Sequence, residues 1–156
     1  MQRWTSQPLT VPQHVGAPYA RADLEIEGVR HDGPSCYVQF YFNLPDANEH
    51  TGRDVSQFAG AFSLFAHGTC WGDAGHCEVP SGPLNVFDRR SPHPLTPINI
   101  TVTVTEALRA VAEDEVTVTV LTFPVLGSDR DESLRSGRVV PCRHPAEEDP
   151  LVERAR

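Results

Sequence analysis

The sequence predicts an all-β domain, built as an antiparallel β-sandwich or a jelly-roll-like barrel with one short helix. Three observations lead to this prediction. At least five segments alternate apolar and polar residues with the period of two that is typical of a half-buried strand. The 14 proline and 11 glycine residues among 156 indicate frequent turns between these segments. Only one short segment has a helical pattern, and this element composition favours antiparallel sheets that pack face to face.

The first two predicted strands cover residues 22–27 and 36–44. Residues 22–27 alternate apolar with charged side chains, so one face of this strand is expected to be buried. Residues 36–44 alternate in the same way but carry aromatic side chains, and the Pro45-Asp46 pair ends the strand. The residues that should share its apolar face are Cys36, Val38, Phe40, Phe42 and Leu44.

The third predicted strand, residues 58–66, has apolar residues on both sides. The expected side-chain distribution is Phe58, Phe62 and Leu64 on one side and Ala59, Ala61 and Phe65 on the other. Gly60 lies at the centre of this strand, which indicates either a bulge or a close approach of another backbone.

Residues 98–104 and 116–120 show the clearest alternation in the chain. Between them the sequence predicts a short helix over residues 106–112. Thr105 is suited to cap this helix, and Glu106 would lie near the positive end of the helix dipole.

The two ends of the chain differ in composition from the centre. Residues 1–21 are expected to form an extended N-terminal arm, residues 22–126 the β-sandwich domain, and residues 127–156 a charged loop and C-terminal tail. Within the tail, residues 138–140 could add a short strand.

Composition excludes several classes of function. The net charge is −8, and nucleic acids and anionic membranes are bound by basic faces, so neither is an expected partner. Lysine does not occur, which excludes a Schiff-base lysine and a P-loop lysine. Residues 1–19 lack the apolar core of a signal peptide, and no run reaches the ~18 apolar residues of a membrane span. We therefore expect a cytoplasmic protein whose cysteines are mostly reduced.

One segment concentrates metal-binding side chains. Residues 67–77 contain two histidines, two cysteines, one aspartate and three glycines, directly after a predicted strand. Thiolate and imidazole together suit zinc or copper, and thiolate suits Cu(I) in particular. The ligands we expect are Cys70, Cys77, His76 and His67, with Asp73 a weaker candidate.

Simpler interpretations of this segment stay open. Its spacing contains no Cys-x2-Cys or His-x3-His pair of the zinc-finger type. Cys70 and Cys77 could form a local disulfide or act as small buried hydrophobic residues. Cys36 and Cys142 are expected to be structural, since Cys36 lies on the apolar face of a strand.

Other residues carry less functional information. The segment 31–34 is expected to be a turn between strands. Tyr37, Tyr41 and Phe65 fall opposite the main apolar faces, and we expect a second hydrophobic face rather than an exposed docking patch. The chain has no Gly-x-Ser-x-Gly element, phosphate-binding glycine loop or His-Glu-x-x-His pair. Catalytic activity of the isolated chain is therefore not expected.

The order of the strands resembles a known family. The segments that carry the resemblance are 24–29, 38–43, 58–62, 101–108 and 116–120. Together they resemble the C-terminal β-domain of tyrosinases, plant polyphenol oxidases and haemocyanins, the type-3 copper proteins. The Phe-Ala-Gly-x-Phe element at 58–62 and the Thr-Glu-x-Leu helix start at 105–108 are its most specific parts.

In that family the β-domain follows a helical core in which six histidines hold two copper ions. No histidine-bearing helix can be drawn in this chain. The resemblance therefore implies a non-catalytic accessory domain or subunit, whose partner is a helical type-3 copper oxidase core. The implied role is to shield the active site or to assist copper loading through the Cys/His loop. That loop is richer in cysteine and histidine than the plant pattern, and the shielding residue is left unassigned.

Two other hypotheses compete with this one. The first is a small structural or binding β-sandwich in which the same loop holds a structural zinc ion or a local disulfide. The second is a metal-dependent oxidase or redox protein that uses the loop directly, which is the weaker hypothesis because no oriented catalytic groups accompany the loop.

Overall fold

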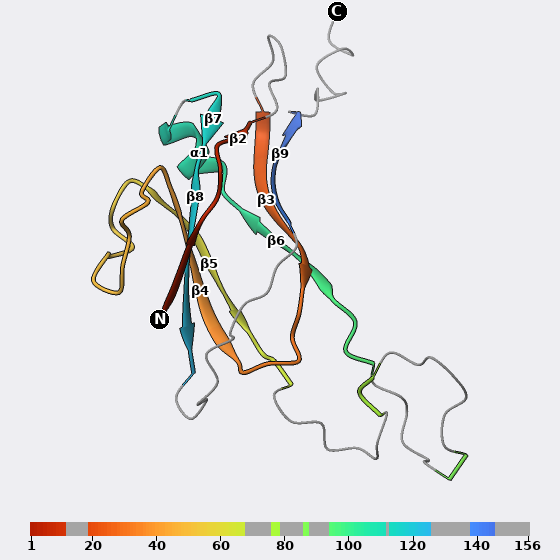
Figure 1. Ribbon diagram of the computed structural model, residues 1–156. Helices are drawn as coiled ribbons and strands as arrows, with labels where there is room; N and C mark the ends of the chain where they lie inside the picture. The colour runs from red at the N-terminus through yellow and green to blue at the C-terminus, as the bar shows by residue number, and fades with distance from the viewer. Residues whose placement is uncertain are drawn as a thin grey trace, which may run out of the picture.

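The protein is an all-β sandwich, and its described residues contain one short helix, as the sequence predicts (Figure 1). The computed structural model describes residues 1–11, 19–67, 76–78, 86–87, 94–111, 113–125 and 138–145. Its elements in chain order are β1 (Gln2–Thr5), β2 (Leu9–Thr10), β3 (Tyr19–Val29), β4 (Cys36–Phe42), β5 (Phe58–Leu64), β6 (Ile98–Thr103), α1 (Thr105–Val111), β7 (Glu115–Val116), β8 (Val118–Pro124) and β9 (Arg138–Pro145).

Two antiparallel sheets form the sandwich. The larger sheet has the strand order β1-β8-β4-β5, and the smaller has the order β6-β3-β9. A two-stranded ladder of β2 and β7 accompanies them. Both sheets stay open in the described part of the chain, so the architecture is the predicted sandwich rather than the barrel.

The main hydrophobic core lies between these sheets. Strand β3 contributes Leu24 and Ile26, and the facing strand β4 contributes Phe40, whose ring stacks on Phe62 of β5 at a centroid distance of 5.8 Å. Leu24 and Ile26 point to the same face of β3, and Val38 and Phe40 to the same face of β4, because successive side chains of a strand alternate between its two faces. The further members of this cluster include Ala22, Cys36, Val38, Phe42, Ala59, Leu64, Val102, Val118 and Val120.

Gly60 allows the two sheets to approach closely through a side chain, and the predicted bulge at this residue is confirmed. A Cβ atom at this position would lie 2.7 Å from Cγ1 of Val102 on the opposite sheet. The register of β4 and β5 also shifts between Phe40 and Tyr41, which is the irregularity of a bulge.

A second hydrophobic cluster covers the outer face of the larger sheet. Tyr41, Ala47 and Leu121 are fully buried there, and Phe58 packs against them. The predicted core role of Tyr41 is therefore confirmed. The predicted distribution of β5 side chains was wrong for Phe58 and Ala59, because the bulge exchanges the faces at this end of the strand.

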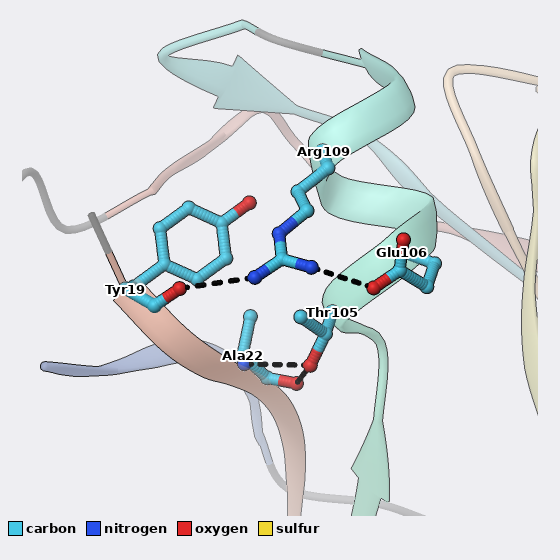
Figure 2. A network of polar contacts seen from close by, with 5 residues as sticks. All are labelled: Tyr19, Ala22, Thr105, Glu106 and Arg109. Atoms are coloured by element: carbon cyan, nitrogen blue, oxygen red, sulfur yellow. Dashed lines mark hydrogen bonds and ion pairs between the residues drawn. The ribbon is translucent and has the colours of Figure 1, made fainter. Parts of the chain in front are cut away.

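Helix α1 is fastened to the start of β3 by polar contacts (Figure 2). The Thr105 hydroxyl accepts a hydrogen bond from the Ala22 N–H at 3.0 Å and donates to the Ala22 carbonyl at 3.4 Å. Thr105 is the first residue of the helix, so its hydroxyl joins two elements instead of capping the helix as expected. Arg109 pairs with Glu106 at 2.7 Å and donates to the Tyr19 carbonyl at 3.2 Å.

Strand pairing extends beyond the predicted domain boundaries of residues 22 and 126. Within the predicted N-terminal arm, β1 pairs with β8 from Gln2 to Thr5. Within the predicted tail, β9 pairs with β3 along almost its whole length, which confirms the short strand expected near residue 138. Residues 2–5 and 138–145 therefore belong to the sandwich. Among the described residues, no helix is both long and apolar enough to cross a membrane.

Candidate functional site

The end of the sandwich opposite α1, where β3 ends and β4 begins, is the candidate site (Figure 1). We call this region the histidine end and define it as residues 30–34 after β3, residues 65–67 after β5, and residues 94–97 before β6. Strand β3 ends and strand β4 begins there, as expected for a turn at residues 31–34. This turn and the segment after β5 carry His31 and His67.

Hydrogen bonds from the backbone of Ala66 and His67 hold the two histidine-bearing segments together. The His67 N–H donates to the His31 carbonyl at 2.7 Å. The Ala66 N–H donates to the Ser35 hydroxyl at 3.0 Å. The His31 and His67 rings meet edge to face with centroids 5.8 Å apart. Nε2 of His31 lies 2.9 Å from the Thr96 carbonyl oxygen, which links the third segment to the pair.

The structure describes three of the four predicted metal ligands. His67 is exposed at the histidine end, and His76 and Cys77 lie in the short segment 76–78. Cys70 lies outside the described residues, as does Asp73. The Leu95 N–H donates to the Cys77 carbonyl at 2.9 Å, so the segment with His76 returns to the connector that leads to Thr96.

Cys77 is disulfide-bonded. A disulfide sulfur has no thiolate to offer a metal ion, so Cys77 could act as a ligand only after reduction. This finding departs from the expectation that the cysteines are mostly reduced. Within the described ranges, no three His, Cys, Asp or Glu side chains are placed to hold a metal ion together. The four-residue metal site therefore stays a prediction.

Cys36 is a buried thiol in the main core at the start of β4. Burial raises its pKa to about 11, because the apolar surroundings disfavour the thiolate. A thiol of this kind is a poor nucleophile and a poor metal ligand near neutral pH. The predicted burial of Cys36 on an apolar strand face is confirmed.

Aromatic side chains on the outer surface differ in their environment. Phe65, directly after β5, is 86% exposed, so its predicted core role was wrong. Strand β5 ends at Leu64, so Phe65 follows the strand rather than belonging to it. Tyr37 packs on Phe123 and beneath the Arg53 guanidinium, whose carbon lies 4.9 Å from the ring centroid. Its buried hydroxyl has no hydrogen-bond partner within the described structure.

His31 is the site residue that sequence reasoning missed. Its neighbours Asp32, Gly33 and Pro34 indicate a turn, and nothing in the local sequence shows that His67 or Thr96 would lie beside it. The pairing of β4 with β5, which places Cys36 opposite Leu64, brings these segments together. The sequence signal that could have found it is the antiparallel pairing of β4 with β5, because His31 precedes the first of these strands and His67 follows the second.

Comparisons with known proteins support the fold. No family model matches the chain, and no curated protein matches it. Among solved structures, a recombinantly expressed latent aurone synthase (polyphenol oxidase) matches with a TM-score of 0.55 and 16% identity, over 92% of this chain and 24% of its own. The enzyme from its natural source matches with a TM-score of 0.54 and 14% identity over the same shares.

A latent apple tyrosinase matches with a TM-score of 0.56 and 16% identity, over 91% of this chain and 26% of its own. The chain thus spans about a quarter of the length of these structures. At this identity the likeness establishes a shared fold, which is that of one part of a tyrosinase-like polyphenol oxidase.

Proposed function

We propose that this chain is a non-catalytic accessory domain or subunit of a tyrosinase-like type-3 copper oxidase. The observation that carries the proposal is the likeness of nearly the whole chain to about a quarter of latent polyphenol oxidases. The order of its strands and the Phe-Ala-Gly-x-Phe and Thr-Glu-x-Leu elements resemble the β-domain of the same family. The sequence elements and the fold therefore lead to the same family.

The copper centre of that family does not fit the residues of this chain. Six histidines on helices are needed, and α1, the one helix in the described part of the chain, contains none. His31 and His67 lie instead on connections at one end of the sandwich. Oxidation of a diphenol would therefore be performed by a helical core, encoded as a separate protein or as another part of a longer chain.

The proposed action of the domain is to cover the entrance of the oxidase active site. The matched polyphenol oxidases are called latent, a word used for an enzyme held in an inactive form. A domain can hold an oxidase inactive by placing a side chain where the substrate would enter. Phe65 is suited to this role because it is large, apolar, 86% exposed and located at the tip of the sandwich.

The test of docking uses the copper core that the proposal requires. The coding sequence next to this chain, or continuous with it, should specify a helical protein with six copper-binding histidines. Purified together, the two parts should form a one-to-one complex in sedimentation equilibrium. A neighbouring region without such a core, or a chain that stays monomeric beside it, contradicts the proposal.

Copper loading is the second proposed action, through Cys70, Cys77, His67 and His76. Under reducing conditions the chain should bind about one equivalent of Cu(I), and changing both cysteines to Ser should abolish this binding. Absence of Cu(I) binding by the reduced chain would remove this action and leave the covering role intact. The matched control is Cys36→Ala, since Cys36 is buried and should not contribute.

A stand-alone structural or binding module is the second candidate function, and the disulfide at Cys77 favours it. A loop closed by a disulfide, or by a structural zinc ion once reduced, stabilises a fold without supplying chemistry. Metal analysis of the purified protein distinguishes the two forms. Stoichiometric zinc that resists dialysis, together with unfolding by a chelator, would support the zinc form.

A further inference from the structure

The histidine end contains a pair of imidazoles, of which only His67 belongs to the predicted Cys/His loop. His31 belongs to the β3–β4 turn and His67 to the segment after β5, so 35 intervening residues separate them in the sequence. Their ring centroids are nevertheless only 5.8 Å apart. We propose that His31 and His67 form a binding site for a divalent transition-metal ion, with Nδ1 of His31 as one ligand atom.

The hydrogen bond of His31 determines which of its nitrogens can bind the ion. Nε2 lies 2.9 Å from the Thr96 carbonyl oxygen, and a carbonyl oxygen can only accept a hydrogen bond. In the neutral imidazole the hydrogen is therefore on Nε2, and the lone pair is on Nδ1. Metal-binding histidines commonly donate their second nitrogen to a backbone carbonyl in this way, which fixes the tautomer and the ring orientation.

The distance between the rings suits a shared ion. A bond of about 2.0–2.1 Å from metal to imidazole nitrogen places each ring centroid roughly 3 Å from the ion, so two ligating rings lie at most about 6 Å apart. The observed 5.8 Å falls within this limit. The edge-to-face arrangement, with planes inclined by 71°, also keeps the rings from stacking on each other.

The backbone holds this pair in place before any ion binds. The His67 N–H donates to the His31 carbonyl, and the Ser35 hydroxyl fixes the adjacent Ala66 N–H. Preformed ligand positions lower the entropic cost of binding. Because His31 is partly exposed and His67 is exposed, an ion and its remaining water ligands can reach the site from solvent.

The chemistry of the donors indicates the class of ion. Imidazole favours Zn(II), Cu(II) and Ni(II) over Mg(II) and Ca(II), which take oxygen ligands. The net charge of −8 also favours the approach of a cation. This site requires no thiolate, so it can form when Cys77 is oxidised, and it shares only His67 with the proposed Cu(I) loop. It does not depend on whether the chain docks on an oxidase.

The experiment is a calorimetric titration of the full chain with Zn(II) under non-reducing conditions. The informative variant is His31→Gln, because the Gln amide N–H can replace Nε2 as the donor to the Thr96 carbonyl while Nδ1 is lost. His50, exposed in the loop between β4 and β5, provides the matched control His50→Ala. We expect one zinc equivalent per chain, at least tenfold weaker binding in His31→Gln and His67→Ala, and unchanged binding in His50→Ala.

A second readout is the electron paramagnetic resonance spectrum of the chain with one equivalent of Cu(II). Hyperfine coupling to two nitrogens is expected in the native protein, and coupling from one of them should disappear in His31→Gln. The proposal is overturned if His31→Gln binds zinc as tightly as the native chain does. It is also overturned if binding depends on Cys77 and His76 but on neither His31 nor His67.

Discussion

The two ends of the sandwich are built differently. At the α1 end, polar side chains are used to join elements: Thr105 binds the β3 backbone, and Arg109 binds Tyr19 and Glu106. At the histidine end, His31, His67 and Phe65 are wholly or partly exposed, and the two histidine-bearing segments are joined by the bond from the His67 N–H to the His31 carbonyl. One end therefore stabilises the fold, while the other has side chains available for an ion or a partner.

This difference makes separable predictions for stability and binding. Substitutions in the core and at the α1 end should lower the free energy of unfolding and leave binding unchanged in the fraction that stays folded. Substitutions at the histidine end should weaken binding and leave the free energy of unfolding nearly unchanged. The first two predictions below pair a structural residue with a histidine-end control, and all four run from the largest expected effect to the smallest.

The largest effect is expected for Phe40→Ala in the main core. Phe40 is fully buried and stacks on Phe62, so its truncation should lower the free energy of unfolding by about 3–5 kcal/mol. Phe65→Ala should change it by less than about 0.5 kcal/mol, because that side chain is exposed. Urea unfolding measures both. Equal losses for the two variants would contradict the division between core and histidine end.

Asn43, just after β4, should have the next largest effect. Its φ of 50° lies in the left-handed region, its side-chain oxygen accepts from the Thr117 N–H at 2.8 Å, and its amide donates to Glu113. Asn43→Ala loses these bonds and adds strain, for an expected loss of about 2–3 kcal/mol. Asn43→Gly should cost less because glycine accepts this φ.

The control for Asn43 at the other end is His31→Gln, which keeps the bond to Thr96 and should change stability little. Thermal unfolding of the three variants gives the order expected from these contacts. A loss in His31→Gln as large as that in Asn43→Ala would show that the histidine end is equally structural.

Removing the Thr105 hydroxyl at the α1 end should have a smaller effect on the free energy of unfolding. Thr105→Val keeps the shape but removes the hydroxyl that satisfies the Ala22 N–H, so a loss of about 1–2 kcal/mol is expected. Thr105→Ser keeps the hydroxyl and should recover most of this loss. Hydrogen exchange at the Ala22 amide should be faster in Thr105→Val than in Thr105→Ser; identical rates would show that the contact does not hold the strand.

The smallest effect near neutral pH concerns Cys36, at the start of β4 near the histidine end. Its pKa is raised from 9.0 to about 11 in the folded protein. Above pH 9 the unfolded chain loses its thiol proton first, so stability should fall as the pH rises from about 9 to about 11. Unfolding measured across this range should show a shallower decline in Cys36→Ala than in the native chain. The same slope in both proteins would assign the decline to other groups, such as Tyr41, whose pKa burial also raises.

Strict alternation made the central strands predictable from the sequence. Residues 22–27, 36–44 and 98–104 fall in β3, β4 and β6 within a few residues, because a strand with one buried face must repeat every second residue. The predicted strand at 116–120 is divided at Thr117, whose backbone N–H binds Asn43 instead of continuing the ladder. That interruption depends on a residue 74 positions away.

The candidate site was less predictable because it too depends on contacts between residues that are far apart in the sequence. The concentration of cysteine and histidine at residues 67–77 was visible in the sequence, but the partner that the fold gives to His67 was not. His31 reaches it only through the pairing of β4 with β5. Phe65 belongs to an apolar run in the sequence, which predicts burial. It is exposed because β5 already ends at Leu64.

The central claim, that the chain covers the active site of a type-3 copper oxidase, is tested most directly by diphenol oxidation. The isolated copper core encoded with this chain is assayed while the chain is titrated in. The rate should fall to a plateau at one equivalent, and Phe65→Ser should need at least tenfold more chain than Trp4→Ser, the control at a half-exposed aromatic on edge strand β1. A rate that does not change as the chain is added would contradict the account.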